Sequence, residues 1–345
     1  MNTTHKKNKI HQFLIKEESE KFSPLYDYVE GVKNQINASA SAVYVIQGNK
    51  VIGEWYSGYD PVTKQKVKED TRYNVFSVRK SYIGLAVEIL INQGKIHSLE
   101  DKILDYLDTE NQTVCKDISI RHIVTHTHGL RFENNELTKF STPGTVWEYN
   151  GAGLSLLYKI ISKVSGSTVN EIIQDYVFQP LNFIETGWEI EYKENLLADV
   201  IELEKPSIRL EDNTGFERNL FVSARELAHW GYFHLKKGLI NGEQVIPSSF
   251  LERTTSIQTP ENLTNTPQNG YFWFRNENKY AKNELGEKIP PRAYQILGAS
   301  GCACLVIPEY DAVAVRMYNK RGNPPSYDYL RDIKNFGNLI DSILK

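Results

Sequence analysis

The sequence has little sulfur, little net charge and no long apolar run. Its 345 residues include only three cysteines and two methionines, and three cysteines cannot build the paired disulfide framework of a small secreted domain. No segment reaches the ~18 consecutive apolar residues of a membrane-spanning helix. The net charge is only -3, so neither a nucleic acid nor a membrane is expected as a partner. A small molecule is the expected ligand, and nothing in the sequence fixes an oligomeric state.

The first 22 residues also lack the apolar core of a secretory signal. Their basic residues are followed by a single short apolar run, Phe13 to Ile15, where a signal peptide has at least about 7 apolar residues. We therefore expect a cytoplasmic protein whose cysteines stay reduced. Cys302 and Cys304 alternate in an expected strand and point to one face, so no disulfide between them is expected.

Strand patterns occupy both ends of the chain. The stretch "AVYVIQGNKVIGEWY" predicts a hairpin that turns at Gly48 and Asn49. Strand character returns at residues 271–276 and 302–318, where Pro308 to Asp311 supplies a turn. Apolar residues at helical spacing over residues 327–345 predict a last helix that packs one face on the sheet.

The middle of the chain has helical periodicity. Apolar spacing predicts helices over residues 77–93, 119–126, 154–166, 168–181 and 223–238, the last capped by Ser223 and ended by Gly238. The expected fold is an antiparallel sheet closed by the two chain ends, with a helical region inserted between them. This gives a sheet domain of residues 1–80 and 255–345, a mainly helical domain of residues 81–254, and a pocket in the cleft between them.

The stretch "FSVRKS" from Phe76 allows two interpretations of Ser77. A serine in the first turn of a helix can cap backbone N–H groups, or face a cleft as a nucleophile. Lys80, three residues on, shares its helical face, and a lysine desolvated in a cleft loses enough basicity to accept a proton. The same spacing recurs at Ser342 and Lys345 at the end of the chain, so spacing alone favours the cap.

Two further stretches change that balance: "PGTVWEYNGAGLSLLYKIISKVSG" from Pro143 and "LGASGCACLVIPEYDAVAVRM" from Leu297. With "FSVRKS" they resemble the motifs of the serine β-lactamase and penicillin-binding protein superfamily, especially its class C-like esterase and 6-aminohexanoate-dimer hydrolase branch. The resemblance runs from about Ala42 onward. It implies a β-lactamase-like α/β (α+β) fold, in which helices from both chain ends flank the antiparallel sheet, and an active site in the cleft.

The resemblance also implies roles for individual residues. Ser77 would be the acylated nucleophile, Lys80 the base that takes its proton, and Tyr149 the residue that passes a proton to the leaving group. A phenol has a pKa of ~10 and needs a nearby cation to act near neutrality, and Lys80 would be that cation. The backbone N–H groups of Ser77 and Cys302 would form the oxyanion hole.

Substrate contacts would come from Ser300 and Gly301 in the third motif, and from Asn150 and Gly151 beside the tyrosine. Two departures from the family pattern concern these motifs. Glycine stands where the second motif has asparagine, and Ala299 stands where the third motif has a cation. Both changes remove contacts expected for a β-lactam or a peptide carboxylate, so the sequence points to esters or uncharged amides. No cofactor is expected.

Three alternatives stay open. His122, His126 and His128 include the i, i+4 pair of a zinc site, but no glutamate follows His122 as in the metalloprotease signature, and no metal is expected. Cys302 could be a nucleophile or a small packing residue. The chain could also be a non-catalytic or penicillin-binding relative that keeps the fold as a ligand-binding protein.

Overall fold

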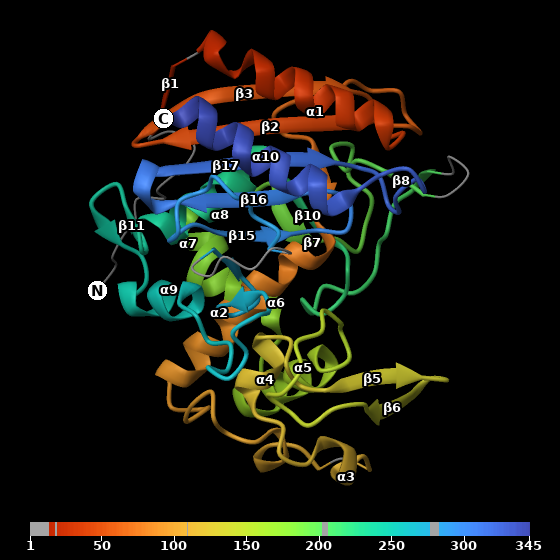
Figure 1. Ribbon diagram of the computed structural model, residues 1–345, viewed down its shortest axis with the longest axis vertical. Helices are drawn as coiled ribbons and strands as arrows, with labels where there is room; N and C mark the ends of the chain where they lie inside the picture. Colours follow the sequence, from red (N-terminus) through yellow and green to blue (C-terminus); the bar gives the residue numbers. More distant parts are fainter. Residues whose placement is uncertain (1–13, 18, 109, 202–205, 277–282) are drawn as a thin grey trace.

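An eight-stranded sheet forms the centre of the protein (Figure 1). The computed structural model describes residues 14–17, 19–108, 110–201, 206–276 and 283–345; residues 1–13, on which most of the signal-peptide expectation rests, lie outside them. In spatial order the strands are β1 (Ile15–Lys16), β3 (Lys50–Gly58), β2 (Ala40–Gln47), β17 (Ala312–Tyr318), β16 (Ala303–Ile307), β15 (Tyr294–Leu297), β14 (Phe274–Arg275) and β13 (Gln268–Asn269).

All neighbouring strands pair antiparallel except β1 and β3, which are parallel. The two ends of the chain meet where β2 pairs with β17. The predicted hairpin forms from β2 and β3, and Gly48 at its turn has a φ of 60°, which glycine adopts without strain. The predicted antiparallel sheet, closed by the chain ends, is therefore confirmed.

Helices cover both faces of this sheet. Figure 1 shows α1 (Ser23–Gln35) and α10 (Tyr329–Leu344) on one face, and α8 (Ala224–Leu235) lies against β2, β16 and β17 on the other. Strand β17 shows why two layers form: Val313 and Val315 pack in the core with α8, while Ala312 and Ala314 pack in the core with α10. Alternate residues of a strand point to opposite faces, so a strand that is apolar throughout is covered on both.

Most of the remaining helices lie below the sheet in Figure 1, and three of them pack on α2 (Arg79–Asn92), which is buried along nearly its whole length. The remaining helices are α3 (Gln112–Cys115), α4 (Ile120–Val124), α5 (Leu154–Ser165), α6 (Val169–Ile173), the π-helix η5 (Gln174–Phe178), α7 (Gln179–Leu181) and α9 (Ser248–Thr255). Short 3-10 turns are η2 (Glu20–Phe22), η3 (Phe76–Val78), η4 (Ile103–Asp105) and η7 (Pro308–Tyr310).

Small sheets also occur in the region of residues 81–254, which the sequence predicts to be mainly helical. Strands β10 (Leu220–Ser223) and β7 (Thr186–Trp188) form a three-stranded sheet with β4 (Arg72–Asn74). The two-stranded pairs are β5 (Leu130–Glu133) with β6 (Glu136–Lys139), β8 (Asp199–Val200) with β9 (Pro206–Ser207), and β11 (Leu239–Ile240) with β12 (Glu243–Gln244). One helix of this region, α8, packs on the central sheet; the division into two domains stays a prediction.

A fully buried ion pair joins α10 to the sheet. The guanidinium of Arg316 on β17 donates to both carboxylate oxygens of Asp332, at 2.9 and 2.5 Å, and the hydroxyl groups of Tyr28 and Tyr327 donate to the same carboxylate. Arg316 pulls the pKa of Asp332 below its usual value against the opposing effect of desolvation. The network satisfies the buried carboxylate from three directions.

Replacing Asp332 with asparagine is expected to lower the free energy of unfolding by about 3 kcal/mol, because it leaves the Arg316 guanidinium buried without a counter-charge. Urea unfolding followed by circular dichroism measures this. The exposed acid Glu261 is the control, and Glu261→Gln is expected to change stability by less than about 0.5 kcal/mol. Equal unfolding midpoints for the two variants would show that the ion pair contributes no net stability.

Candidate active site

Ser77 lies in the 3-10 turn η3, between β4 and α2. Its side chain caps neither η3 nor α2. The N-cap residues of these helices are Val75 and Val78, and neither helix start has a side-chain hydrogen bond to its backbone. The interpretation of Ser77 as a helix cap is therefore wrong. The preceding residue, Phe76, has a φ of 44°, a left-handed conformation that is strained for a bulky residue and is often found at functional sites.

Hydrogen bonds and close packing hold this turn against the third motif. The Asn74 side chain accepts from the Phe76 backbone N–H at 3.1 Å, and the Ser300 hydroxyl donates to the Asn74 carbonyl at 3.1 Å. At Gly298, a Cβ atom would lie 2.4 Å from the carbonyl oxygen of Val75, so only glycine permits this approach. The fold thus fixes the turn that carries Ser77 beside the turn between β15 and β16.

Lys80 is only 5% exposed, near the start of α2. Its Nζ lies 3.9 Å from the centroid of the Tyr149 ring. Desolvation, followed by the neighbouring Arg79 and Arg218, lowers the pKa of Lys80 to about 7. In the described ranges no carboxylate forms an ion pair with it to oppose this shift. A large share of Lys80 is therefore neutral near pH 7 and able to accept a proton.

Tyr149 lies in the loop before α5, with its ring between those of His126 and Phe274 at centroid distances of 4.6 and 6.1 Å. It lines the open cavity and is 42% exposed, yet desolvation by the surrounding protein raises the pKa of its phenol, an effect only partly offset by a hydrogen bond with Ser77. The expectation that Lys80 would bring this phenol toward neutrality is corrected, because the Lys80 amine faces the ring and desolvation dominates. The phenol of Tyr149 is therefore expected to be protonated near neutral pH.

The third motif forms a tight turn. The Gly298 N–H donates to the Cys302 carbonyl at 2.8 Å, and the Gly301 N–H donates to the Gly298 carbonyl at 2.9 Å. Gly301 has a φ of 85°, and a Cβ there would lie 2.7 Å from the Tyr318 ring. Within the described part of the chain, the backbone N–H groups of Ser77 and Cys302 donate to no other protein group. Their assignment to an oxyanion hole stays a prediction.

The side chain of Cys302 is a packing residue in this arrangement. It is fully buried, its Sγ lies 3.1 Å from the Ser300 hydroxyl, and desolvation raises the pKa of the thiol to about 11. A buried thiol of this kind is inert, because the nucleophile is the thiolate. Cys115 and Cys304 are likewise buried and free of disulfides.

Asn150 and Gly151 do not line the cavity. The Asn150 amide donates to the Leu130 carbonyl and to the Glu148 carboxylate, both at 3.0 Å, and its oxygen accepts from the Ala152 N–H at 3.0 Å. These bonds shape the loop that carries Tyr149, while Gly151 is exposed. Of the expected substrate contacts, the structure therefore brings only Ser300 and Gly301 to the cavity, and their binding role stays a prediction.

The histidines of the possible zinc site, His122, His126 and His128, contact neighbouring segments of the protein. The His122 Nδ1 accepts from the Ser119 N–H at 3.1 Å, the His128 Nδ1 accepts from the Leu130 N–H at 3.0 Å, and His126 packs on Tyr149. Among the described residues no group of three side chains is arranged to hold a metal ion.

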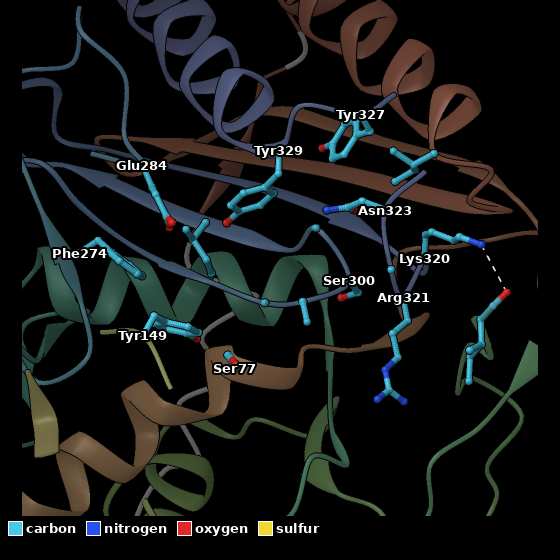
Figure 2. A pocket seen from close by; sticks show the side chains of 17 residues that line it. Ser77, Tyr149, Phe274, Glu284, Ser300, Lys320, Arg321, Asn323, Tyr327 and Tyr329 are labelled. Atoms are coloured by element: carbon cyan, nitrogen blue, oxygen red, sulfur yellow. Dashed lines mark hydrogen bonds between the residues drawn. The ribbon is translucent and has the colours of Figure 1, made fainter. Parts of the chain in front are cut away.

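A cavity of about 700 Å³ opens over Ser77 and Tyr149 (Figure 2). Besides the third motif, it is lined by residues that the sequence analysis did not assign to the site. The polar and aromatic ones are Phe274, Glu284, Lys320, Arg321, Asn323, Tyr327 and Tyr329. Phe274 lies in β14 and Glu284 in the segment before β15, while the others lie in the loop that joins β17 to α10 or, for Tyr329, at the start of α10. Only the polar stretch directly after β17, with Lys320, Arg321 and Asn323, gave a local sign in the sequence that part of the cavity lining lies there.

The sheet flanked by helices, with a Ser-x-x-Lys turn and a tyrosine at one cavity, defines the β-lactamase-like class of serine hydrolases. The family model described as Beta-lactamase matches residues 27–336, and the chain belongs to this family. An uncharacterized protein of Alkalihalophilus pseudofirmus is 39% identical, over 94% of this chain and 97% of its own. Penicillin-binding protein 4* of Bacillus subtilis is 25% identical, over 45% of this chain and 39% of its own.

Solved structures show the same fold. A class C β-lactamase superposes with a TM-score of 0.77 at 15% identity, covering 94% of this chain and 96% of its own. EstCE1, a hydrolase with promiscuous acyltransferase activity, gives a TM-score of 0.71 at 19% identity, covering 92% of this chain and all of its own. In the described ranges of this chain, no helix is both long enough and apolar enough to span a bilayer.

Proposed function

We propose that this protein hydrolyses esters or uncharged amides through an acyl-enzyme formed on Ser77. The observation that carries the proposal is that Ser77 and Tyr149 line one cavity, while the amine of the buried Lys80, whose pKa is about 7, lies 3.9 Å from the centroid of the Tyr149 ring. Family membership supports the reaction class, and the altered second and third motifs support the substrate class.

The first half-reaction acylates the enzyme. The neutral Lys80 amine takes the proton of the Ser77 hydroxyl as the Ser77 oxygen bonds to the substrate carbonyl carbon. The N–H groups of Ser77 and Cys302 stabilise the negative charge that develops on the carbonyl oxygen. Tyr149 donates its proton to the leaving oxygen or nitrogen as that bond breaks, and the Lys80 ammonium returns a proton to Tyr149.

The second half-reaction releases the acid. Water attacks the acyl carbon and gives its proton to the neutral Lys80 amine, the Ser77 oxygen leaves, and a proton returns to that oxygen through Tyr149. The same three side chains therefore serve both steps.

Penicillin binding is the second candidate, because the cavity contains two cations that the sequence analysis did not weigh. Lys320 and Arg321 line it and could bind a carboxylate in place of the missing motif cation. Lys320 already donates to the Ile201 carbonyl at 3.4 Å, and the Arg321 guanidinium lies 5.9 Å from the centroid of the Phe76 ring. These partners weigh against a carboxylate site, and the test includes a β-lactam.

A direct comparison of p-nitrophenyl butyrate with a chromogenic cephalosporin tests the proposal. We expect kcat/KM for the ester to exceed that for the cephalosporin by about 100-fold or more, which corresponds to the loss of roughly two polar substrate contacts. A preference for the cephalosporin, or a stable acyl-enzyme with penicillin and no ester turnover, would favour the penicillin-binding alternative. A folded protein inactive toward both would favour the non-catalytic one.

A further inference from the structure

The cavity has two chemically different ends with Ser77 between them. Figure 2 shows Phe274, Glu284 and Tyr329 on one side of Ser77, together with Tyr149, and shows Lys320 and Arg321 on the other. One end therefore combines aromatic rings with a carboxyl group, and the other end is cationic. A substrate that spans Ser77 meets both.

Glu284 has no partner of opposite charge in the described part of the chain. Desolvation raises the pKa of its carboxyl to about 7, and no cation acts to lower it. Glu287, three residues later, shows the contrast: hydrogen bonds from Lys334 and Asn338 lower the pKa of its carboxyl to about 2. The carboxyl group in the cavity is thus the one that an arriving cation would stabilise.

Aromatic rings line the cavity at the same end as this carboxyl group. Tyr149 and Phe274 stack with ring planes 29° apart, and the negative charge of Glu284 helps to raise the pKa of both the Tyr149 and the Tyr329 phenols. Aromatic faces next to a carboxylate are favourable surroundings for an ammonium group, which gains both cation–π attraction and a counter-ion. A quaternary ammonium suits them best, because it needs no hydrogen-bond acceptors.

We propose that Glu284, Phe274 and Tyr329 bind an ammonium group on the alcohol portion of an ester substrate. This rests on the function proposed above and names its substrate class: esters of cationic amino alcohols. The alcohol portion is assigned to this end because Tyr149, the donor to the leaving oxygen, lies beside Glu284. Acylation bonds the acyl carbon to Ser77 and releases the amino alcohol with the proton from Tyr149; water then releases the acid.

Two esters of matched shape test this at pH 8, where the Glu284 carboxyl is ionised. Butyrylcholine carries a quaternary nitrogen where 3,3-dimethylbutyl butyrate carries a neutral carbon. The wild-type protein is expected to favour butyrylcholine by about 10-fold in kcat/KM, and Glu284→Gln is expected to reduce this ratio to about 3 or less, because only the cation–π attraction of the rings remains. Glu287→Gln is the control and is expected to keep the wild-type ratio. Tyr329→Leu, which removes one ring, is expected to reduce the ratio in part.

Equal kcat/KM for the two esters in the wild-type protein, or an unchanged preference in Glu284→Gln, would overturn the inference. Binding of choline chloride by titration calorimetry tests it without turnover. Wild-type affinity at least about 10-fold above that of Glu284→Gln supports it, and equal affinities overturn it. If choline binds in this way but neither ester is hydrolysed, the proposed hydrolase function fails while the ammonium site stands.

Discussion

Ser77→Ala is expected to lower kcat for p-nitrophenyl butyrate by about 10⁶-fold, as removal of the nucleophile does in other serine hydrolases. Alanine has no oxygen that could bond to the acyl carbon, so no acyl-enzyme can form. The Lys80 amine then has no hydroxyl group from which to take a proton. The oxyanion donors and the cavity remain, and account for any residual rate. Release of nitrophenol by wild type and variant at equal protein concentration measures the effect.

The chain supplies a matched control for this substitution. Ser342 lies in the last turn of α10, three residues before Lys345, which follows the helix. Its side chain is exposed, and its hydroxyl donates to the Asn338 carbonyl at 2.9 Å. Ser342→Ala is expected to keep full activity, because the same spacing there faces no cavity. Retention of more than a hundredth of wild-type turnover by Ser77→Ala, in protein free of wild-type contamination, would contradict the assigned nucleophile.

Lys80→Met is expected to lower kcat/KM for the same ester by up to about 10⁴-fold, the upper range for loss of a general base. Methionine keeps much of the side-chain volume in this buried place and has no proton acceptor. In the wild-type protein, Lys80 must be neutral to act. Since its pKa is lowered to about 7, kcat/KM is expected to rise with pH through that value and level off above it. The reaction is stopped at each pH, and the nitrophenol released is measured after the sample is made alkaline; the rates obtained in this way give the pH profile.

Two controls belong to this profile. Lys345→Met changes an exposed lysine that pairs with Asp341 at 2.9 Å and is expected to leave the rate unchanged. Glu284 also has a pKa near 7, so the profile is repeated in Glu284→Gln. An inflection that persists there belongs to Lys80, and one that disappears with the carboxyl group would contradict the role of Lys80 as the titrating base.

Local patterns in the sequence predicted the local structure well. The hairpin at Gly48 and Asn49 forms as expected, and Ser223 caps α8 by accepting the Glu226 N–H at 3.1 Å. Each of these depends on residues a few positions apart, whose preferences act before tertiary packing. Ser77, Lys80 and Tyr149 could be picked out only because three short motifs together resemble those of a known family, since the local Ser-x-x-Lys spacing alone favoured a helix cap.

Features that depend on distant segments could not be predicted. Glu284 and Lys320 reach the cavity from loops and Tyr329 from the start of α10; the sheet order sets the course of these segments, and no periodicity marks the three residues. The pKa of Tyr149 was misjudged for a similar reason, since the sequence shows a nearby lysine but not the desolvation that outweighs it. The Asn150 amide donates to the Leu130 carbonyl on β5 and accepts from the Ala152 N–H in its own loop, and neither bond could be foreseen from the sequence.

The covalent step on Ser77 is tested most directly by intact-mass and peptide mass spectrometry after treatment with a fluorophosphonate. We expect one adduct per chain, located in the tryptic peptide of residues 73–79, whose only serine is Ser77. The adduct is expected to be absent from Ser77→Ala. A folded protein that forms no adduct, or one that carries it on the peptide of another residue such as Ser300, would contradict the assignment of Ser77 as the nucleophile.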